Sequence, residues 1–276
     1  MRDTVWLNGE LVPADDAVIP VADHGITVGD GLFETMKVVD GVPFALTRHL
    51  RRLRRTAAGL GLRGVPDDDA LRVAVARTIA ANGDTVGRVR LTVTGGVGPA
   101  GTIRGDVGPT VLVVCGGAPE WTPTAAVITV PWTRNERGAL AGLKTTSYAE
   151  NVIALERAHD AGADEAIFPN TQGNLCEGTG TNVFLVVDDQ LVTPPLTAGC
   201  LAGVTRELLL ECIDVAERDV PVEALARAPE AFLSSSTRDV QPIASVDGHA
   251  LASAPGPWTK KAVEAFHALE ARTLDP

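Results

Sequence analysis

The sequence predicts an α+β fold in two domains, and three observations lead to that prediction. Tight-turn dipeptides separate short apolar runs, apolar residues at helical spacing mark separate helices, and strands and helices do not alternate strictly. A cluster of turn-forming residues at 118–123 divides the chain. We therefore expect a small α+β domain at 1–117, a linker at 118–123 and a larger α/β domain at 124–276.

The expected N-terminal domain opens with two hairpins. Asn8-Gly9 and Asp40-Gly41 are dipeptides typical of the tight turn between antiparallel strands. A helix is expected to start at Thr47 as its N-cap, because Leu50, Leu53, Ala57 and Leu60 follow at helical spacing. The other elements expected here are strands at 5–7, 11–12, 33–39, 42–46, 86–94 and 110–114, and a helix at 69–81 with an acidic cap at 67–69.

The expected C-terminal domain mixes the two kinds of element. The pattern predicts strands near 126–130, 165–168, 182–187, 190–193 and 231–234, and helices near 149–161, 204–215 and 258–271.

Composition narrows the class of protein. The net charge of −11 argues against nucleic acid or an anionic membrane surface as the main partner. No apolar run reaches the roughly 18 residues of a membrane span, and the N-terminus lacks the pattern of a signal peptide. The four cysteines have no CxxC spacing, so we expect no metal site and a reducing, cytoplasmic location.

Lysine is scarce, and one lysine in the middle of the chain draws attention. Of 24 Lys and Arg residues, only Lys37, Lys144, Lys260 and Lys261 are lysine. Lysine can offer a neutral amine to a carbonyl, whereas arginine stays protonated. Lys144 lies in a polar stretch, GLKTTSYAENV, and is a candidate Schiff-base residue; a drift in composition that left a few lysines by chance is the alternative.

Three further motifs have the chemistry of a phosphate-bearing ring cofactor. Glu177 opens the turn EGTGTNVF, where a carboxylate can pair with a ring nitrogen cation. The helix start at 203–205 offers unpaired N–H groups and a hydroxyl to an anion, and the hydroxyls at 234–237 suit a phosphate. Arg52, at the edge of an apolar stripe, can grip a phosphate with two hydrogen bonds. Taken singly, each motif also fits an ordinary turn, helix cap or solvated face.

A glycine-rich stretch imitates a dinucleotide site. Residues 96–101 match GxGxxG after an expected strand, but the residues that follow are too rich in Gly and Pro to begin the required helix. A nicotinamide-binding oxidoreductase is therefore a disfavoured alternative that rests on this stretch alone.

In combination, these motifs resemble the class IV aminotransferases, which are fold type IV pyridoxal-phosphate enzymes. The likeness runs from VWLNGELV through DHGITVGDGLFETMKV and HLRRL to LAGVTRELLL and EAFLSSSTRDVQPI. The family includes D-amino-acid, branched-chain and (R)-amine transaminases and aminodeoxychorismate lyase. The resemblance implies two α/β domains with the active site between them, a pyridoxal 5'-phosphate cofactor and a homodimer.

The resemblance also implies a role for each matching residue. Lys144 would hold the cofactor and shuttle the proton in a ping-pong aldimine mechanism, and Glu177 would keep the pyridine nitrogen protonated. Leu201 would pack under the ring. The residues implied to bind the phosphate are Arg52, Gly203, Val204, Thr205, Ser236 and Thr237.

The substrate is less closely defined by the sequence. Phe33, Thr35 and Lys37 resemble the strand that lines the substrate pocket, and Gly95-Gly96 stand where D-amino-acid enzymes carry an Arg and a His. In their place, Arg238 is expected to bind the substrate carboxylate. The alternatives for this role are Arg90, Arg104, Arg134 and Arg137.

Three members of the family remain candidates. We expect a transaminase that moves an amino group from D-amino acids, with (R)-amines as further donors, to a keto acid such as 2-oxoglutarate or pyruvate. Aminodeoxychorismate lyase and then a branched-chain L-amino-acid transaminase are the alternatives. A non-catalytic binding domain of the same fold is disfavoured because Lys144 and Glu177 are both present.

Overall fold

A computed structural model describes residues 3–276, which form two compact units. Unit 1 comprises the chain up to Pro119, together with Leu143–Tyr148 and Thr273–Pro276. Unit 2 comprises Glu120–Gly142 and Ala149–Arg272. The two short returning segments of unit 1 were not part of the expected domain at 1–117, and one of them carries Lys144.

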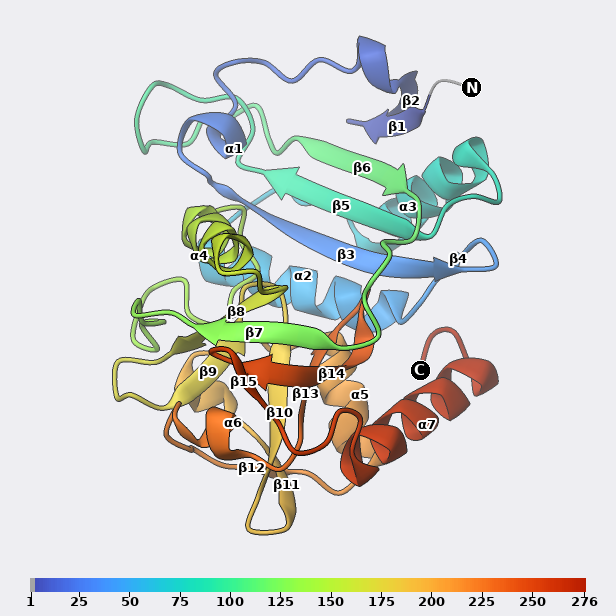
Figure 1. The fold of residues 1–276 in the computed structure, drawn as a ribbon. Coiled ribbons are helices and arrows are strands. Elements are labelled where there is room, and N and C mark those ends of the chain that lie inside the picture. The colour runs from blue at the N-terminus through green and yellow to red at the C-terminus, as the bar shows by residue number, and fades with distance from the viewer. Residues whose placement is uncertain (1–2) are drawn as a thin grey trace. The chain divides into compact units, whose positions relative to one another are not determined.

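Unit 1 is built on an antiparallel six-stranded sheet in the order β2-β1-β6-β5-β3-β4 (Figure 1). Helices α2 and α3 pack on one face of it, where Met36, Leu53, Val75 and Leu91 belong to one buried apolar cluster. The elements are β1 (Thr4–Leu7), β2 (Glu10–Pro13), η1 (Ala14–Asp16), α1 (His24–Thr27), β3 (Gly31–Val39), β4 (Val42–Pro43), α2 (Leu46–Leu60), α3 (Asp68–Asn82), β5 (Arg88–Thr94) and β6 (Val111–Gly116).

Both predicted hairpins of unit 1 are confirmed, but the predicted cap of α2 is wrong. Asn8 and Gly9 have φ values of 48° and 107°, as a turn that matches the strand twist requires. Helix α2 begins at Leu46, after Ala45 in the left-handed conformation. Thr47 is therefore inside the helix, and its N–H donates to Asp275 Oδ1 at 2.8 Å. A residue 228 positions away thus supplies the cap, which local sequence could not reveal.

The segment Leu143–Tyr148 belongs to unit 1 because its backbone joins strand β3. Phe33 N donates to Lys144 O at 3.2 Å, and Thr146 N donates to Gly31 O at 2.8 Å. Lys144 is thereby fixed against a strand that lies more than one hundred residues earlier in the sequence.

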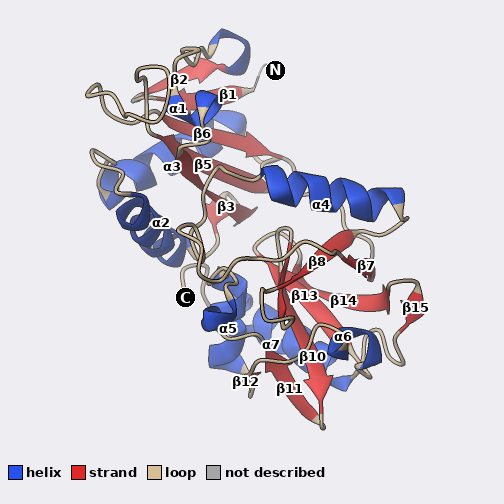
Figure 2. Cartoon of the chain, turned by 90° about the vertical axis from the view of Figure 1, so that its left-hand side faces the viewer, coloured by secondary structure: helices blue, strands red, loops and turns tan. Residues whose placement is uncertain are grey.

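Unit 2 contains a mixed nine-stranded sheet in the order β12-β11-β10-β13-β14-β7-β8-β9, with β15 paired to β14 (Figure 2). Helix α4 packs on β8, while α5 and α7 pack against each other and on β13 and β14 respectively. The strands are β7 (Ala125–Thr129), β8 (Glu165–Pro169), β9 (Leu175–Gly178), β10 (Asn182–Val187), β11 (Gln190–Thr193), β12 (Ala216–Glu217), β13 (Ala231–Ser235), β14 (Asp239–Val246) and β15 (His249–Ala250). The helices are α4 (Ala149–Asp160), η2 (Leu196–Ala198), α5 (Val204–Cys212), α6 (Ala224–Arg227) and α7 (Pro257–Arg272).

Strand β14 was not predicted, although it is central in the sheet. Pro242 lies in its middle opposite Phe232, and proline cannot donate a ladder hydrogen bond. The register between β14 and β7 shifts between Ile243 and Ser245, so an irregularity directly beside the proline accommodates it. Helix α5 was predicted to reach residue 215, but Ile213 is already extended and the helix stops at Cys212.

No helix within residues 3–276 combines the length and apolar character needed to cross a bilayer. The fold class predicted from the sequence, a mixed α and β chain built around two sheets, is confirmed.

Candidate active site

In unit 1, the Lys144 side chain lies beside two aromatic side chains, Phe33 and Tyr148. Its amine is 4.3 Å from the centre of the Phe33 ring and donates to the Tyr148 hydroxyl at 3.3 Å. The Phe33 and Tyr148 rings meet edge to face at 5.0 Å. Among residues 3–276, no carboxylate lies within ion-pair distance of Lys144. An amine without a carboxylate partner, beside a phenol, is suited to chemistry at nitrogen.

Alternate residues of strand β3 lie on the same side of the sheet as Phe33, the ring that contacts Lys144 and Tyr148. Leu32, Met36 and Val38 belong to the apolar cluster under the helices, so Phe33, Thr35 and Lys37 share the opposite face of the strand. Thr35 pairs with Arg90 of β5, whose guanidinium lies 3.7 Å from the Phe33 ring centre. The Lys37 amine lies 4.9 Å from the ring of Phe44.

Arg52 is buried deeper than its predicted place at the edge of the core. Its side chain is 5% exposed and donates to both oxygens of Glu34, at 2.8 and 2.6 Å. His49 Nδ1 lies 2.6 Å from the same carboxylate. Burial alone would raise the pKa of Glu34, but the charges and hydrogen bonds of Arg52 and His49 lower it to about 2. Burial lowers the pKa of His49 below its usual value of 6.5, although Glu34 opposes that shift.

Gly95 and Gly96 have a packing role in the structure. A Cβ on Gly95 would meet the Asp30 carboxylate, and one on Gly96 would meet the Gly108 carbonyl. Gly96 also has φ of +72°, which L side chains rarely adopt. No helix follows them, whereas a dinucleotide site requires a helix to begin there.

In unit 2, Glu177 lies near the end of β9 and is held by two neighbours. Leu201 N donates to its Oε2 at 2.8 Å, and Arg134 Nε lies 3.3 Å from its Oε1. Arg134 also stacks on the Phe168 ring at 4.0 Å. The carboxylate is therefore oriented from one side by a backbone donor and a guanidinium.

Asn182 connects this carboxylate turn to the start of helix α5. Its Nδ2 donates to Leu201 O at 2.9 Å, and a Cβ on Gly203 would collide with its side-chain oxygen. No side chain caps α5 at Gly203, so the first amides, those of Val204 and Thr205, have no side-chain acceptor there. This uncapped helix start fits an anion such as a phosphate.

The hydroxyl-rich turn at Ser236 and Thr237 joins β13 to β14. Ser235 opposes Asp239 across the hairpin, and Asn182 opposes Ser234 on the neighbouring strand. The starts of β10 and β14 and the end of β13 therefore meet at one end of the sheet. Glu165, at the start of β8, accepts a hydrogen bond from Thr179 N in the turn between β9 and β10. This topology brings Glu177, the α5 start and the hydroxyl turn together.

Arg238 does not fit its expected role as the substrate-carboxylate residue. Its side chain is 6% exposed, lies 3.6 Å from Glu165 Oε2, and donates to Gln241 Oε1 at 2.5 Å. Its guanidinium also lies 3.8 Å from the Trp121 ring centre. These contacts commit Arg238 to the interior of unit 2.

The other predicted candidates differ in their partners. Arg104 is bound by both oxygens of Asp30 at 2.6 Å, and Arg134 is bound by Glu177 and Glu150. Arg137 is exposed in the loop before Lys144. Arg90, the neighbour of Phe33, has no carboxylate within ion-pair distance in the described chain.

Sequence reasoning missed three residues of these clusters: Tyr148, Asn182 and Glu165. Tyr148 could have been found, since it is the single tyrosine of the chain and follows Lys144 by four residues. Asn182 and Glu165 are the first residues of their strands, and only the strand order shows what they contact.

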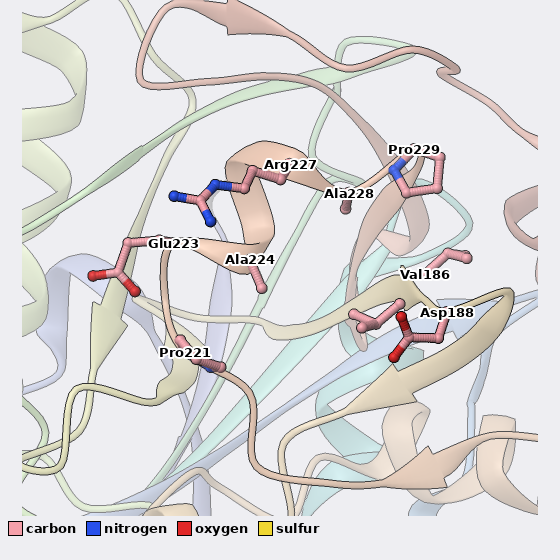
Figure 3. A pocket seen from close by; sticks show the side chains of 9 residues that line it. Val186, Asp188, Pro221, Glu223, Ala224, Arg227, Ala228 and Pro229 are labelled. Atoms are coloured by element: carbon pink, nitrogen blue, oxygen red, sulfur yellow. The ribbon is translucent and has the colours of Figure 1, made fainter.

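A separate cavity of about 410 Å³ lies in unit 2, beside the turn after β10 and helix α6 (Figure 3). It is lined by Val186, Val187, Asp188, Pro221, Glu223, Ala224, Arg227, Ala228 and Pro229. None of the predicted site residues lines it.

Comparisons with known proteins identify the family of this chain. The profile of the family "Amino-transferase class IV" matches residues 31–246. A Methanocaldococcus jannaschii protein assigned as a branched-chain-amino-acid aminotransferase is 32% identical over 95% of this chain and 94% of its own. The D-alanine aminotransferase of Bacillus licheniformis is 29% identical over 93% of each chain.

Solved structures of similar fold give the same picture. The branched-chain amino acid aminotransferase of Thermobaculum terrenum, in its pyridoxal-phosphate form, matches with a TM-score of 0.86 at 26% identity, over 97% of this chain and 94% of its own. A Legionella pneumophila protein assigned as a 4-amino-4-deoxychorismate lyase matches with a TM-score of 0.86 at 25% identity, over 92% and 96%. The chain therefore belongs to the class IV aminotransferases, a family of pyridoxal-phosphate enzymes, as its motifs predicted.

Proposed function

We propose that this chain is a transaminase that takes D-amino acids as donors and a 2-keto acid as acceptor. The observation that carries the proposal is the Lys144 amine, which lies beside a phenol and an aromatic ring and has no carboxylate partner in the described chain. The D-amino-acid part is supported by the segments KTTSYAEN and CEGTGTNVF and by the likeness to a D-alanine aminotransferase.

The residues of unit 2 fit the polar ends of pyridoxal phosphate. Glu177, oriented by Arg134 and Leu201, would hold a proton on the ring nitrogen. The uncapped α5 start, Ser236 and Thr237 would bind the phosphate, whereas Arg52, predicted for the same anion, is already paired with Glu34 in unit 1. When bound, the cofactor supplies a conjugated ring that accepts the electron pair left at the substrate α-carbon.

Lys144 would hold the cofactor and then move the proton at the substrate α-carbon. The Tyr148 hydroxyl, 3.3 Å from the amine, would keep that amine oriented by exchanging a hydrogen bond with it. Phe33 fixes both groups through its ring contacts and excludes water from one side of the amine.

We propose Arg90 as the cation for the substrate carboxylate, in place of Arg238. It lies on the same Phe33 ring as Lys144, and no protein carboxylate competes for it in the described chain. A guanidinium matches a carboxylate with two parallel hydrogen bonds.

A branched-chain L-amino-acid transaminase is the second candidate. It is favoured by the 32% identity to the Methanocaldococcus jannaschii protein, which exceeds the 29% identity to the Bacillus enzyme. The two candidates would use the same cofactor chemistry, so the donor separates them.

We also propose a homodimer. Val152 and Ile153 of α4 are 59% and 56% exposed, although the same helix buries Ala154 and Ala158. These two adjacent apolar side chains would be covered by a second copy of the chain. Sedimentation of the purified chain measures the state directly, and a monomer at micromolar concentration would contradict the proposal.

A half-reaction panel tests the function. The cofactor-loaded enzyme is mixed with D-alanine, L-leucine, (R)-1-phenylethylamine or aminodeoxychorismate, and loss of the bound-cofactor absorbance is followed. A rapid change with D-alanine supports the proposal, and one with L-leucine alone supports the second candidate. Pyruvate release from aminodeoxychorismate without an acceptor would establish the lyase instead.

A further inference from the structure

A buried carboxylate in unit 2, Glu165, lies between the two cofactor-binding turns of that unit. It is the first residue of β8 and is 1% exposed. Its Oε2 lies 3.6 Å from the guanidinium of Arg238, whose side chain is 6% exposed. Neither residue has been given a role in the proposed reaction above.

One side of Glu165 holds the turn that follows Glu177. Its Oε1 accepts a hydrogen bond from Thr179 N at 3.0 Å and another from the Thr179 hydroxyl. Its Oε2 accepts from the Thr181 hydroxyl at 3.2 Å. The turn is packed so closely that a Cβ on Gly178 would collide with the Thr181 hydroxyl and crowd Glu165.

The other side of Glu165, through Arg238, holds the hydroxyl turn. Arg238 N donates to Ser235 Oγ at 3.1 Å, which closes the turn around Ser236 and Thr237. Trp121, which stacks on the Arg238 guanidinium, donates from Nε1 to Thr237 O at 2.8 Å. Trp121 therefore contacts both the side chain of Arg238 and the backbone of the turn.

We propose that Glu165 is a positioning residue that fixes the spacing between the turn after Glu177 and the Ser236–Thr237 turn through its pair with Arg238. The inference rests on the proposed function, because those turns would hold the ring nitrogen and the phosphate of one cofactor. A rigid ligand binds well only if its two polar ends meet donors at a fixed separation. A carboxylate shared by both turns sets that separation.

The two connections can be broken separately. Glu165→Gln keeps an oxygen for Thr179 N but places an amide against Arg238, so it disturbs the phosphate end. Thr179→Val removes one hydroxyl bond to Glu165 and leaves Arg238 paired, so it disturbs the ring-nitrogen end. Glu230→Gln is the matched control, because Glu230 is 3% exposed and bonds Trp258 N and Thr259 N at the start of α7, apart from both turns.

The test measures the affinity of each apoprotein for pyridoxal phosphate by fluorescence titration, together with the ³¹P NMR shift of the bound phosphate and apoprotein melting. We expect Glu165→Gln to bind about tenfold more weakly or worse, as loss of a supporting shell does elsewhere, and to move the ³¹P signal. Thr179→Val should weaken binding without moving that signal. Glu230→Gln should melt earlier yet bind the cofactor as the wild type does.

If Glu165→Gln fails to fold, the double variant Glu165→Leu/Arg238→Met removes both charges together, a change that buried pairs tolerate. It should fold and still show weaker binding and a shifted ³¹P signal. Wild-type affinity and an unmoved signal in a folded Glu165 variant would overturn the inference. Failure of the wild-type chain itself to bind the cofactor would instead overturn the proposed function.

Discussion

The two units differ in which of their cations are paired with a carboxylate. In unit 2, the side chains of Arg134, Arg206 and Arg238 are each at most 15% exposed, and each lies beside a carboxylate. In unit 1, Arg52 is paired in the same way with Glu34, but Lys144 and Arg90 lie on the ring of Phe33, and neither has a carboxylate within ion-pair distance in the described chain.

This difference shows where an anionic ligand can be received. A cation paired inside the protein already has its counter-charge, so it supports structure. A cation on an aromatic ring keeps most of its charge for a ligand, because the ring attraction amounts to only about 0.5–2 kcal/mol. In the proposed reaction, unit 1 would supply the amine and a guanidinium that has no carboxylate partner among the described residues, and unit 2 would supply oriented acceptors and amides.

The largest effect is expected for Lys144→Ala. Removal of the amine that moves the proton should lower the rate of the half-reaction by at least roughly 10²–10⁴-fold. Lys144→Arg is the control, because it keeps the positive charge but cannot offer a neutral amine. Single-turnover absorbance measures both variants, and a Lys144→Arg variant with wild-type rate would contradict the assigned role.

Breaking the buried pair of unit 1 should have the next largest effect. Glu34→Gln leaves Arg52 buried without its counter-charge, which is expected to cost about 3–5 kcal/mol of unfolding free energy. Urea denaturation at pH 7 measures it. Asp68→Asn is the control, since its pair with Arg54 is about half exposed and should cost less than about 1 kcal/mol.

The same pair predicts a pH dependence. The pKa of Glu34 is about 2 in the folded chain, below its ordinary 4.5, so the unfolded chain takes up this proton at higher pH. Its stabilisation is complete above about pH 4.5 and is lost as the pH falls toward 2. His49, whose pKa is lowered, adds a loss that begins below about pH 6.5. Glu34→Gln should therefore flatten the fall in the denaturation midpoint between pH 4.5 and 2, and an unchanged slope would contradict the assignment.

Arg90 is expected to give a smaller effect, confined to substrates with a carboxylate. Arg90→Leu should raise KM for the amino-acid donor about 10–100-fold, because it removes a charge-assisted hydrogen bond worth about 1.5–3 kcal/mol. (R)-1-phenylethylamine, which has no carboxylate, should be turned over as before. Arg88→Leu, two residues earlier and exposed on the same strand, is the control. Equal losses for both donors would rule out carboxylate binding.

Tyr148→Phe should give the smallest change. It removes one neutral hydrogen bond to the Lys144 amine, worth about 0.5–1.5 kcal/mol, so kcat should fall only about threefold to tenfold. A drop as large as that of Lys144→Ala would instead make Tyr148 a proton-transfer residue.

Local sequence signals predicted most of the elements but not their partners. Asn8-Gly9 and Asp40-Gly41 predicted their turns because the required backbone angles depend on those residues alone. The cap of α2 was mispredicted because Asp275 supplies it from the far end of the chain. Strand β14 was missed because Pro242 argues against a central strand, and an irregularity that accommodates it depends on the neighbouring strand.

The sequence by itself determined the chemistry of this protein: one lysine in a polar segment, a glutamate before a glycine-rich turn, and hydroxyls and amides suited to a phosphate. Such groups can be recognised in a sequence because few residue types can offer an amine to a carbonyl, a carboxylate to a ring nitrogen or a hydroxyl to a phosphate. Tertiary structure alone decided which of the positive charges are paired with a carboxylate. Arg238 and Arg90 are alike as residues, but strand order places the Glu165 carboxylate beside the first and the ring of Phe33 beside the second. Pairing depends on which strands become neighbours, and that is a property of the whole sheet.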